Sequence, residues 1–216
     1  MRGAVEAAEA GPGLDEITFG QPFKSTPSTI SLGSTLSLTH PVEIRGPLVE
    51  VSGELVPGAT VHAGTAFTIS TPGTVIEGLG IDATSIGVQI LGGLGAEIRN
   101  NFISGVEGTL PQAGVEVNPG SGTEGNLVEG NVIKVPGYYS WGVAVQYGAN
   151  RIFGNEIIGG GPGISMGGCC YQGIDLSVSA AGNQIGGDSA ESENVITGFW
   201  YGAIWYHTSS HNEVGR

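Results

Sequence analysis

The chain has 216 residues, which suits one domain, and 40 of them are glycine, whereas glycine supplies about 7% of an average protein. There are 7 basic residues against 20 acidic ones, so the net charge is −13. A surface of this sign repels phosphate backbones and anionic lipid headgroups, which argues against nucleic-acid binding. Apolar runs stay short of the roughly 18 residues that cross a bilayer, so we expect no membrane insertion.

Residues 2–10 are rich in alanine and glutamate, and Gly11, Pro12 and Gly13 follow them. Alanine and glutamate favour a helix, whereas glycine and proline end one. The sequence therefore predicts a short helix within residues 1–13. Beyond it, short runs alternate between apolar and polar residues, which is typical of strands. These runs are residues 17–19, 29–32, 35–38, 42–44 and 48–51.

From residue 64 onward, two short motifs recur at intervals of roughly 20 to 31 residues, which is the signature of a repeat architecture. One motif begins with asparagine and continues with apolar residues, as at Asn101, Asn131, Asn155 and Asn194. The other is an alternating segment of the type Gly-Val-x-Val. It stands at residues 66–69, 87–90, 114–117, 142–145, 173–176 and 203–206.

Short strands at this period, without helices between them, predict a parallel β-solenoid over residues 14–216, with the N-terminal helix capping its open end. Glycine would supply the positive φ that the corners of each coil require. Asparagines at equivalent places would stack as amide ladders, and Asn126, Asn150 and Asn183 offer a second such set. Residues 186–193 interrupt the pattern and are predicted to form an inserted loop.

Residues 75–81, 98–105, 183–187 and 194–198 show the repeat most clearly. These segments resemble the coils of right-handed parallel β-helix repeat proteins, the pectate-lyase-like superfamily. The resemblance covers nearly the whole chain and implies an all-β, right-handed parallel β-helix.

The opening of the chain, residues 1–10 and 12–19, is similar to the Leu-Arg-Glu-Ala-Ile start of many large bacterial secreted or surface-anchored β-helix proteins. This resemblance implies an extracellular or cell-surface setting in bacteria. We also expect the chain to be a fragment of a longer protein.

The variable residue of each Gly-Val-x-Val segment should point outward, because side chains alternate across a strand and its neighbours are apolar. Aligning the coils gives two outward columns. β-Helix enzymes of the resembled superfamily build their active sites on this face. The first column holds Thr68, Gln89, Glu116, Ala144, Asp175 and Trp205, and the second holds Ser70, Leu91, Asn118, Gln146, Ser177 and His207.

Glu116 and Asp175, with His207 nearby, are the candidate catalytic residues. Successive coils lie about 4.8 Å apart, so the two acidic residues, two coils apart, would be separated by roughly 9.6 Å. That separation approaches the upper end of the roughly 6.5 to 9.5 Å expected for an inverting acid and base pair. The alternative is that both are solvated carboxylates on an acidic surface.

A pectate-type lyase needs an arginine or lysine base opposite calcium-binding carboxylates, and neither outward column contains a basic residue. A lyase is therefore less favoured than a hydrolase.

Residues 92–97 resemble one calcium-binding nonapeptide, but such sites need tandem copies. We predict no metal site and no cofactor, with calcium as an alternative. The adjacent Cys169 and Cys170 are left as either a vicinal disulfide or two free thiols.

Aromatic residues gather in the loops that lead into the outward strands, and one stands on the outward face itself. Flat rings on one side of a solenoid offer a stacking platform for sugar rings. The alternative is that these rings cover the core on the loop side. The candidate binding residues are Tyr138, Tyr139, Trp141, Tyr171, Trp200, Tyr201 and Trp205.

Two functions follow from these observations. The first is a non-catalytic segment of a bacterial secreted or cell-surface protein, acting as a rigid stalk or a carbohydrate-binding surface. The second is a polysaccharide-active enzyme, with an inverting hydrolase favoured over a lyase. In both cases the expected partner is a polysaccharide or cell-surface glycan, and the chain is a monomer or part of a larger chain.

Overall fold

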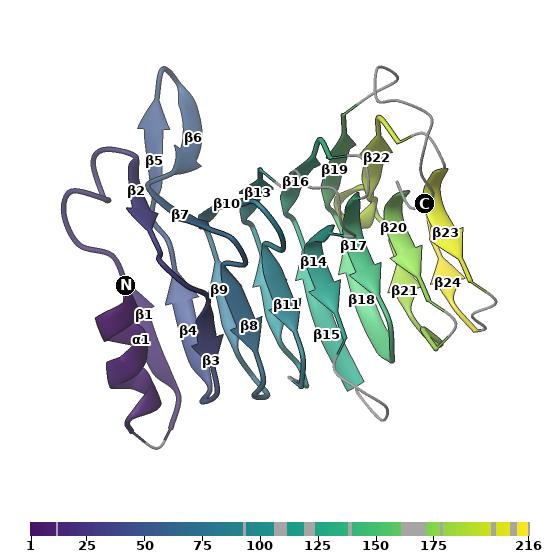
Figure 1. Cartoon of the computed structure of the whole chain (residues 1–216). Coiled ribbons are helices and arrows are strands. Elements are labelled where there is room, and N and C mark those ends of the chain that lie inside the picture. Colours follow the sequence, from purple (N-terminus) through teal and green to yellow (C-terminus); the bar gives the residue numbers. More distant parts are fainter. Residues whose placement is uncertain are drawn as a thin grey trace.

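The structure is a computed structural model, and it describes residues 1–11, 13–92, 94–105, 112–118, 124–137, 140–160, 172–177, 179–199, 202–207 and 211–215. Within these residues the chain forms a parallel β-solenoid that follows one short helix, α1 (Arg2–Glu9) (Figure 1). The predicted all-β class and the predicted N-terminal helix are confirmed.

Three parallel sheets form the walls of the solenoid, and within the described residues they hold eight, seven and seven strands. Each coil contributes one strand to each sheet in turn. Sheet A comprises β1 (Asp15–Thr18), β4 (Val42–Arg45), β9 (Val75–Glu77), β12 (Glu97–Arg99), β15 (Glu124–Glu129), β18 (Ala149–Phe153), β21 (Gln184–Ile185) and β24 (Glu213–Val214). Sheet B comprises β2 (Ser28–Ser31), β7 (Ala59–Ala63), β10 (Gly80–Ala83), β13 (Phe102–Ser104), β16 (Val132–Val135), β19 (Glu156–Gly159) and β22 (Val195–Thr197). Sheet C comprises β3 (Leu36–Leu38), β8 (Phe67–Ile69), β11 (Val88–Ile90), β14 (Gln112–Val117), β17 (Ser140–Val145), β20 (Gln172–Leu176) and β23 (Gly202–Tyr206).

The core fills the interior of the three sheets with stacked aliphatic side chains. In sheet A, for example, Ile44 pairs with Ile76, and Ile76 pairs with Ile98 on the next coil. All three side chains are fully buried. Burying such a side chain stabilises a fold by about 1.5 to 3 kcal/mol, so this repeated stacking favours one register for every coil.

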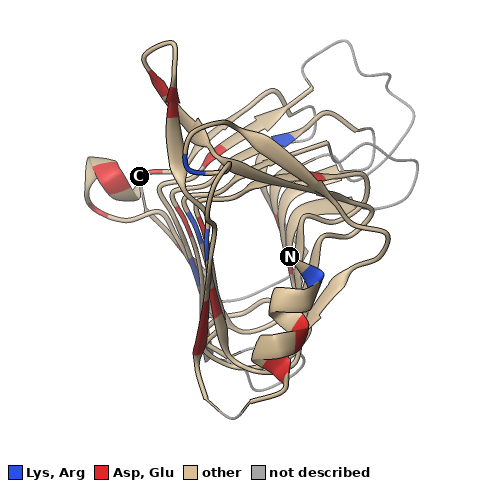
Figure 2. Ribbon diagram, turned by 90° about the vertical axis from the view of Figure 1, so that its left-hand side faces the viewer, with Lys and Arg blue, Asp and Glu red and all other residues tan. Residues whose placement is uncertain are grey.

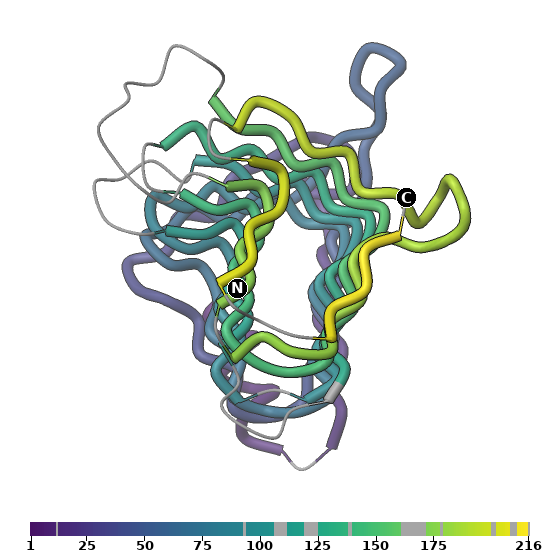
Figure 3. The backbone as a smooth tube through the Cα atoms, turned by 90° about the vertical axis from the view of Figure 1, so that its right-hand side faces the viewer, coloured from purple at the N-terminus to yellow at the C-terminus, as the bar shows by residue number. Residues whose placement is uncertain are grey.

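The solenoid is right-handed. Seen from the C-terminal end (Figure 3), the last coil passes through β21, β22 and β23 anticlockwise while the chain advances toward the viewer. A path that turns anticlockwise as it approaches is a right-handed helix, which is also the rule for crossovers between parallel strands. The predicted right-handed β-helix is therefore confirmed.

Both predicted asparagine ladders are present. In the first, Asn101 donates from its side-chain Nδ2 to Oδ1 of Asn131 over 3.1 Å, and Asn131 donates in the same way to Asn155 over 3.0 Å. Asn131 Nδ2 also reaches the main-chain oxygen of Ile98. Each amide thus ties one coil to the next where the backbone leaves sheet A. The second ladder runs through Asn126, Asn150, Asn183 and Asn212.

Glycine has two roles, of which the sequence predicted one. At Gly130 and Gly154, beside the first ladder, φ is 64° and 60°, a conformation that L side chains avoid. At Gly142, by contrast, the reason is space. A Cβ there would lie 2.6 Å from the main-chain oxygen of Gly173 and closer still to Cγ2 of Ile157. The glycine of the repeated Gly-Val-x-Val segment therefore allows sheets B and C to approach each other.

Helix α1 lies at the N-terminal end of the solenoid, beside the first strands (Figure 2). Its Val5 and Ala8 are buried and belong to the same core as the strands. The carboxylate of Glu9 accepts hydrogen bonds from the main-chain N–H of Thr39 at 2.8 Å and of His40 at 3.1 Å. The hydroxyl of Thr39 also donates to Glu9. These contacts fasten the C-terminal end of the helix to the link between β3 and β4.

Two segments depart from the regular coil, a hairpin and an inserted loop. Strands β5 (Leu48–Val51) and β6 (Glu54–Pro57) pair antiparallel and project from the solenoid (Figure 1). Their turn has Ser52 at φ 55° and Gly53 at φ 87°, the pattern of a two-residue hairpin turn. The predicted strand at residues 48–51 therefore belongs to a hairpin rather than to a wall. The predicted inserted loop at residues 186–193 is confirmed and contains a short 3₁₀ helix, η1 (Ala190–Ser192).

Candidate functional site

The outward face of sheet C holds the predicted columns. Glu116 pairs with Ala144 on the next coil, Ala144 pairs with Asp175, and Asp175 pairs with Trp205. On the other side, Glu116 pairs with Gln89. The register of the repeats therefore places Glu116 and Asp175 two coils apart, as predicted.

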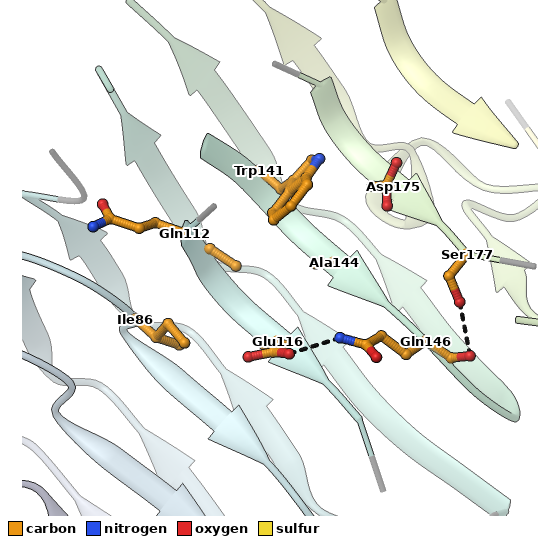
Figure 4. A pocket seen from close by; sticks show the side chains of 9 residues that line it. Ile86, Gln112, Glu116, Trp141, Ala144, Gln146, Asp175 and Ser177 are labelled. Carbon is orange, nitrogen blue, oxygen red and sulfur yellow. Dashed lines mark hydrogen bonds between the residues drawn. The ribbon is translucent and has the colours of Figure 1, made fainter. Parts of the chain in front are cut away.

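A pocket of about 220 Å³ opens on this face between the two acidic residues (Figure 4). Gln112 lies on one side and Asp175 on the other, with Trp141 and Glu116 between them. Three of the residues that the sequence singled out, Glu116, Trp141 and Asp175, are thus brought together. The complete lining is Ile86, Gln112, Ala113, Glu116, Trp141, Ala144, Gln146, Asp175 and Ser177.

Glu116 is held between two glutamines from its neighbouring coils. Gln89 donates from Nε2 to Oε2 over 2.7 Å. Gln146 donates from Nε2 to Oε1 over 2.8 Å (Figure 4). Gln146 is itself placed by Ser177, whose hydroxyl donates to the main-chain oxygen of Gln146 over 2.9 Å. Because both oxygens are engaged, the carboxylate keeps one orientation at the edge of the pocket.

Asp175 lies on β20 with its side chain 12% exposed, and Nε2 of His207 is 3.0 Å from Oδ1. Burial raises the pKa of Asp175 above its usual value, while the charge and the hydrogen bond of His207 act in the opposite direction. His207 follows β23 and is 46% exposed. It therefore supports Asp175 from the solvent side and does not line the pocket.

Trp141 presents part of its indole to the pocket. Its Nε1 donates to Oε1 of Gln172 over 2.7 Å, and Gln172 is its partner on the next strand. This bond fixes the plane of the ring. Trp205, in contrast, is 40% exposed, lies outside the pocket lining and makes an edge contact with the ring of His207 at 6.1 Å between centroids.

Gln112 is the site residue that the sequence did not reveal. It is only 9% exposed, and its Oε1 has no hydrogen-bond partner among the described residues. This oxygen has almost no exposed surface, and a buried carbonyl oxygen without a donor costs free energy. The signal in the sequence is weak: Gln112 precedes the Gly-Val-x-Val segment at residues 114–117 by two positions.

Five of the predicted aromatic binding residues, and both cysteines, lie outside the described residues. They are Tyr138, Tyr139, Tyr171, Trp200 and Tyr201, with Cys169 and Cys170. Within the described ranges, no group of three or more His, Cys, Asp or Glu side chains is placed to hold a metal ion.

The charges of sheet A contrast with those of sheet C. On sheet A, Arg45 pairs with Glu43 at 2.7 Å and also with Glu77, while Arg99 pairs with Glu97 at 2.9 Å. The acidic and basic charges thus neutralise one another, within a strand at Glu43 and Glu97 and between two coils at Glu77. On the described strands of sheet C, the charged side chains are Glu116 and Asp175 alone.

Fold and site together define a right-handed parallel β-solenoid with an acidic, partly aromatic pocket on one wall. Comparisons of this chain with protein-family models, with curated proteins and with solved structures return no match. In the described part of the chain, no helix has the length and apolar character needed to cross a membrane.

Proposed function

We propose that the chain binds carbohydrate through the outward face of sheet C, as a segment of a bacterial secreted or cell-surface protein of the pectate-lyase-like kind. The supporting observation is the pocket itself, in which a partly exposed indole lies among amide and carboxylate groups. Sugar rings stack on aromatic faces through their C–H groups, while their hydroxyls exchange hydrogen bonds with amides and carboxylates. Trp141 would supply the stacking face, and Gln112, Glu116 and Asp175 would supply the polar contacts.

The rigidity of the wall suits this role. Glu116 and Trp141 are each held by a hydrogen bond from or to a neighbouring coil. A site whose side chains are already ordered loses less conformational entropy when a ligand binds. The stacked coils thus present a fixed surface along which a polymer can lie.

The test is a glycan screen followed by a titration with the best ligand, monitored by isothermal calorimetry. Trp141→Ala is expected to weaken binding at least tenfold. The matched control is Phe102→Ala, because Phe102 is a partly exposed ring on sheet B, beneath Lys134 and away from the pocket. Unchanged binding by the Trp141→Ala variant would show that the pocket is not the binding site.

A second candidate, an inverting glycoside hydrolase, is favoured by the environment of Asp175. A buried carboxyl with a raised pKa retains its proton to higher pH and can give it to a leaving glycosidic oxygen. Glu116 would then act as the base that takes a proton from the attacking water. His207 would adjust the acidity of Asp175 from outside the pocket.

The enzymatic candidate has its own experiment. Polysaccharides are incubated with the wild-type chain, with Glu116→Gln and with Asp175→Asn, and new reducing ends are measured. A hydrolase predicts release that falls at least a hundredfold in both variants. Equal release from wild type and variants, or none from any of them, eliminates this candidate and leaves binding untouched.

A further inference from the structure

We infer that the pocket on sheet C receives a glycan carrying protonated amino groups, and this inference rests on the proposed carbohydrate binding. The charge of the pocket favours a cation. The charged members of the pocket lining are Glu116 and Asp175, and no lysine or arginine stands on the described strands of sheet C. Opposite charges attract and like charges repel, most strongly where solvent is partly excluded. An ammonium group is therefore favoured here, and a uronate or sulfate is disfavoured.

The balance of donors and acceptors points the same way. Three side-chain donors beside Glu116 and Trp141 are engaged inside the protein, since Gln89 and Gln146 donate to Glu116, and Trp141 donates to Gln172. The hydroxyl of Ser177 donates to a main-chain oxygen. Apart from Nε2 of Gln112, for which the described residues supply no acceptor, the polar atoms that the pocket still offers are mainly acceptor oxygens.

Two of these acceptors have no donor among the described residues. One is Oε1 of Gln112, on a side chain that is more than nine-tenths buried, and a ligand reaches this oxygen when the side chain turns toward the pocket. The other is Oδ2 of Asp175, since His207 engages Oδ1. An ammonium group supplies three N–H donors and accepts nothing, so it complements this set better than a hydroxyl or an acetamide does.

The indole of Trp141 lies between Gln112 and Asp175 in the pocket (Figure 4). Cations are attracted to the face of a tryptophan ring. The same ring that stacks against a sugar would thus also favour a charged amine on that sugar. The chemical class that fits all three features is a polymer of hexosamine units with free amino groups.

The experiment compares three oligosaccharides of equal length with the intact chain by isothermal calorimetry, at about pH 6, where free amines are protonated. The probes are a glucosamine oligomer, its N-acetylated counterpart and a galacturonate oligomer. We expect the glucosamine oligomer to bind at least tenfold more tightly than the acetylated one, and the galacturonate oligomer to show no binding. Added sodium chloride should weaken the first interaction and leave the second unchanged.

Variants of the two acidic residues test whether the preference for free amino groups arises in the pocket. Glu116→Gln and Asp175→Asn should each reduce affinity for the glucosamine oligomer about tenfold. Affinity for the acetylated oligomer should fall by a clearly smaller factor, because it loses polar contacts but no charge attraction. Glu97→Gln, on sheet A, is the matched control and should change neither. The comparison of oligomers in the wild-type chain needs no variant, so it holds even if one variant folds poorly.

The outcomes separate the two proposals. Equal or tighter binding of the acetylated oligomer, lost in Trp141→Ala, would overturn the amino-sugar inference and keep carbohydrate binding. Tight binding of the galacturonate oligomer would likewise overturn the inference alone. Failure of every glycan in a broad screen to bind would overturn both.

Discussion

His207 and Asp175 meet across two successive coils, with Nε2 of the imidazole 3.0 Å from Oδ1 of the carboxyl group. The pair is asymmetric, because the carboxyl is 12% exposed and the imidazole 46% exposed. A second pair, His62 and Asp82, has the same chemistry at 2.8 Å, but its members are 46% and 43% exposed. The two pairs differ mainly in burial, so comparing them separates the cost of burying a carboxylate from the benefit of its histidine.

Asp175→Asn is expected to raise the melting temperature at pH 7. Burial raises the pKa of Asp175, so the folded chain holds the proton more tightly than the unfolded chain. Ionisation therefore costs stability once the pH exceeds the folded-state pKa, and the asparagine avoids that cost. We expect a gain of about 1 to 3 °C at pH 7 and none at pH 3, measured by circular dichroism.

The exposed pair is the control for this prediction. Asp82→Asn removes a carboxylate that is not buried, so it should give no gain at pH 7. If Asp175→Asn instead lowers the melting temperature at pH 7 more than at pH 3, the interaction with His207 outweighs burial.

Asn131→Ala is expected to destabilise the fold by about 3 kcal/mol, because its buried partners lose their hydrogen bonds. Asn131 accepts from the main chain and side chain of Asn101 and donates to Asn155 and to the oxygen of Ile98. Asn118→Ala, on the outward face of sheet C, is the control and should cost less than about 0.5 kcal/mol. Urea unfolding measures both. Similar losses at the two positions would mean that the ladder adds no stability of its own.

Gly142→Ala should destabilise the solenoid by about 1 to 3 kcal/mol, because the added methyl group would overlap Ile157 and the oxygen of Gly173. Gly64→Ala is the matched control, since a Cβ there meets nothing within 4 Å. Its expected effect is between zero and a gain of about 1 kcal/mol. Thermal unfolding of the two variants side by side gives the comparison, and equal effects would contradict a close approach of sheets B and C.

Helix α1 should separate from the first coil in acid. Partial burial acts to raise the pKa of Glu9, but hydrogen bonds from Thr39 and His40 outweigh it and lower the pKa to about 2. The stability that Glu9 contributes is therefore present above the ordinary value of 4.5 and is lost as the pH falls toward 2.

Hydrogen-exchange protection of residues 2–9, measured by mass spectrometry, tests this prediction. Protection should fall between pH 4.5 and pH 2, and Glu9→Gln should lower it at neutral pH. Glu6→Gln, an exposed change on the same helix, should leave it intact. Protection that is independent of pH in the wild type would show that Val5 and Ala8 hold the helix without Glu9.

The repeats made the outward columns predictable, because period-two strands and a fixed asparagine position determine the register of each coil. Glu116 and Asp175 could therefore be placed on one face from the sequence alone. Gln112 could not be identified as a site residue, since its role depends on β14 beginning two residues before the Gly-Val-x-Val segment. The hydrogen bond between Trp141 and Gln172 likewise depends on β17 and β20 beginning before their Gly-Val-x-Val segments.

The hairpin and the close glycines were missed for different reasons. Residues 48–51 alternate like any wall strand, and only Ser52 and Gly53 mark the turn that sends them outward. In the sequence, the glycine of each Gly-Val-x-Val segment looks like a turn residue. Its real constraint is an isoleucine on a different sheet, which no local pattern shows.

The proposed binding of a glycan in the pocket between Gln112 and Asp175 can be observed residue by residue. The most direct measurement is a nuclear magnetic resonance titration of the ¹⁵N-labelled chain with a glucosamine oligomer. We expect the indole Nε1–H signal of Trp141 and the side-chain amide signals of Gln112 and Gln146 to shift together and saturate, while signals from sheet A stay in place. Saturable shifts confined to another wall, or no shift with any glycan tested, would contradict it.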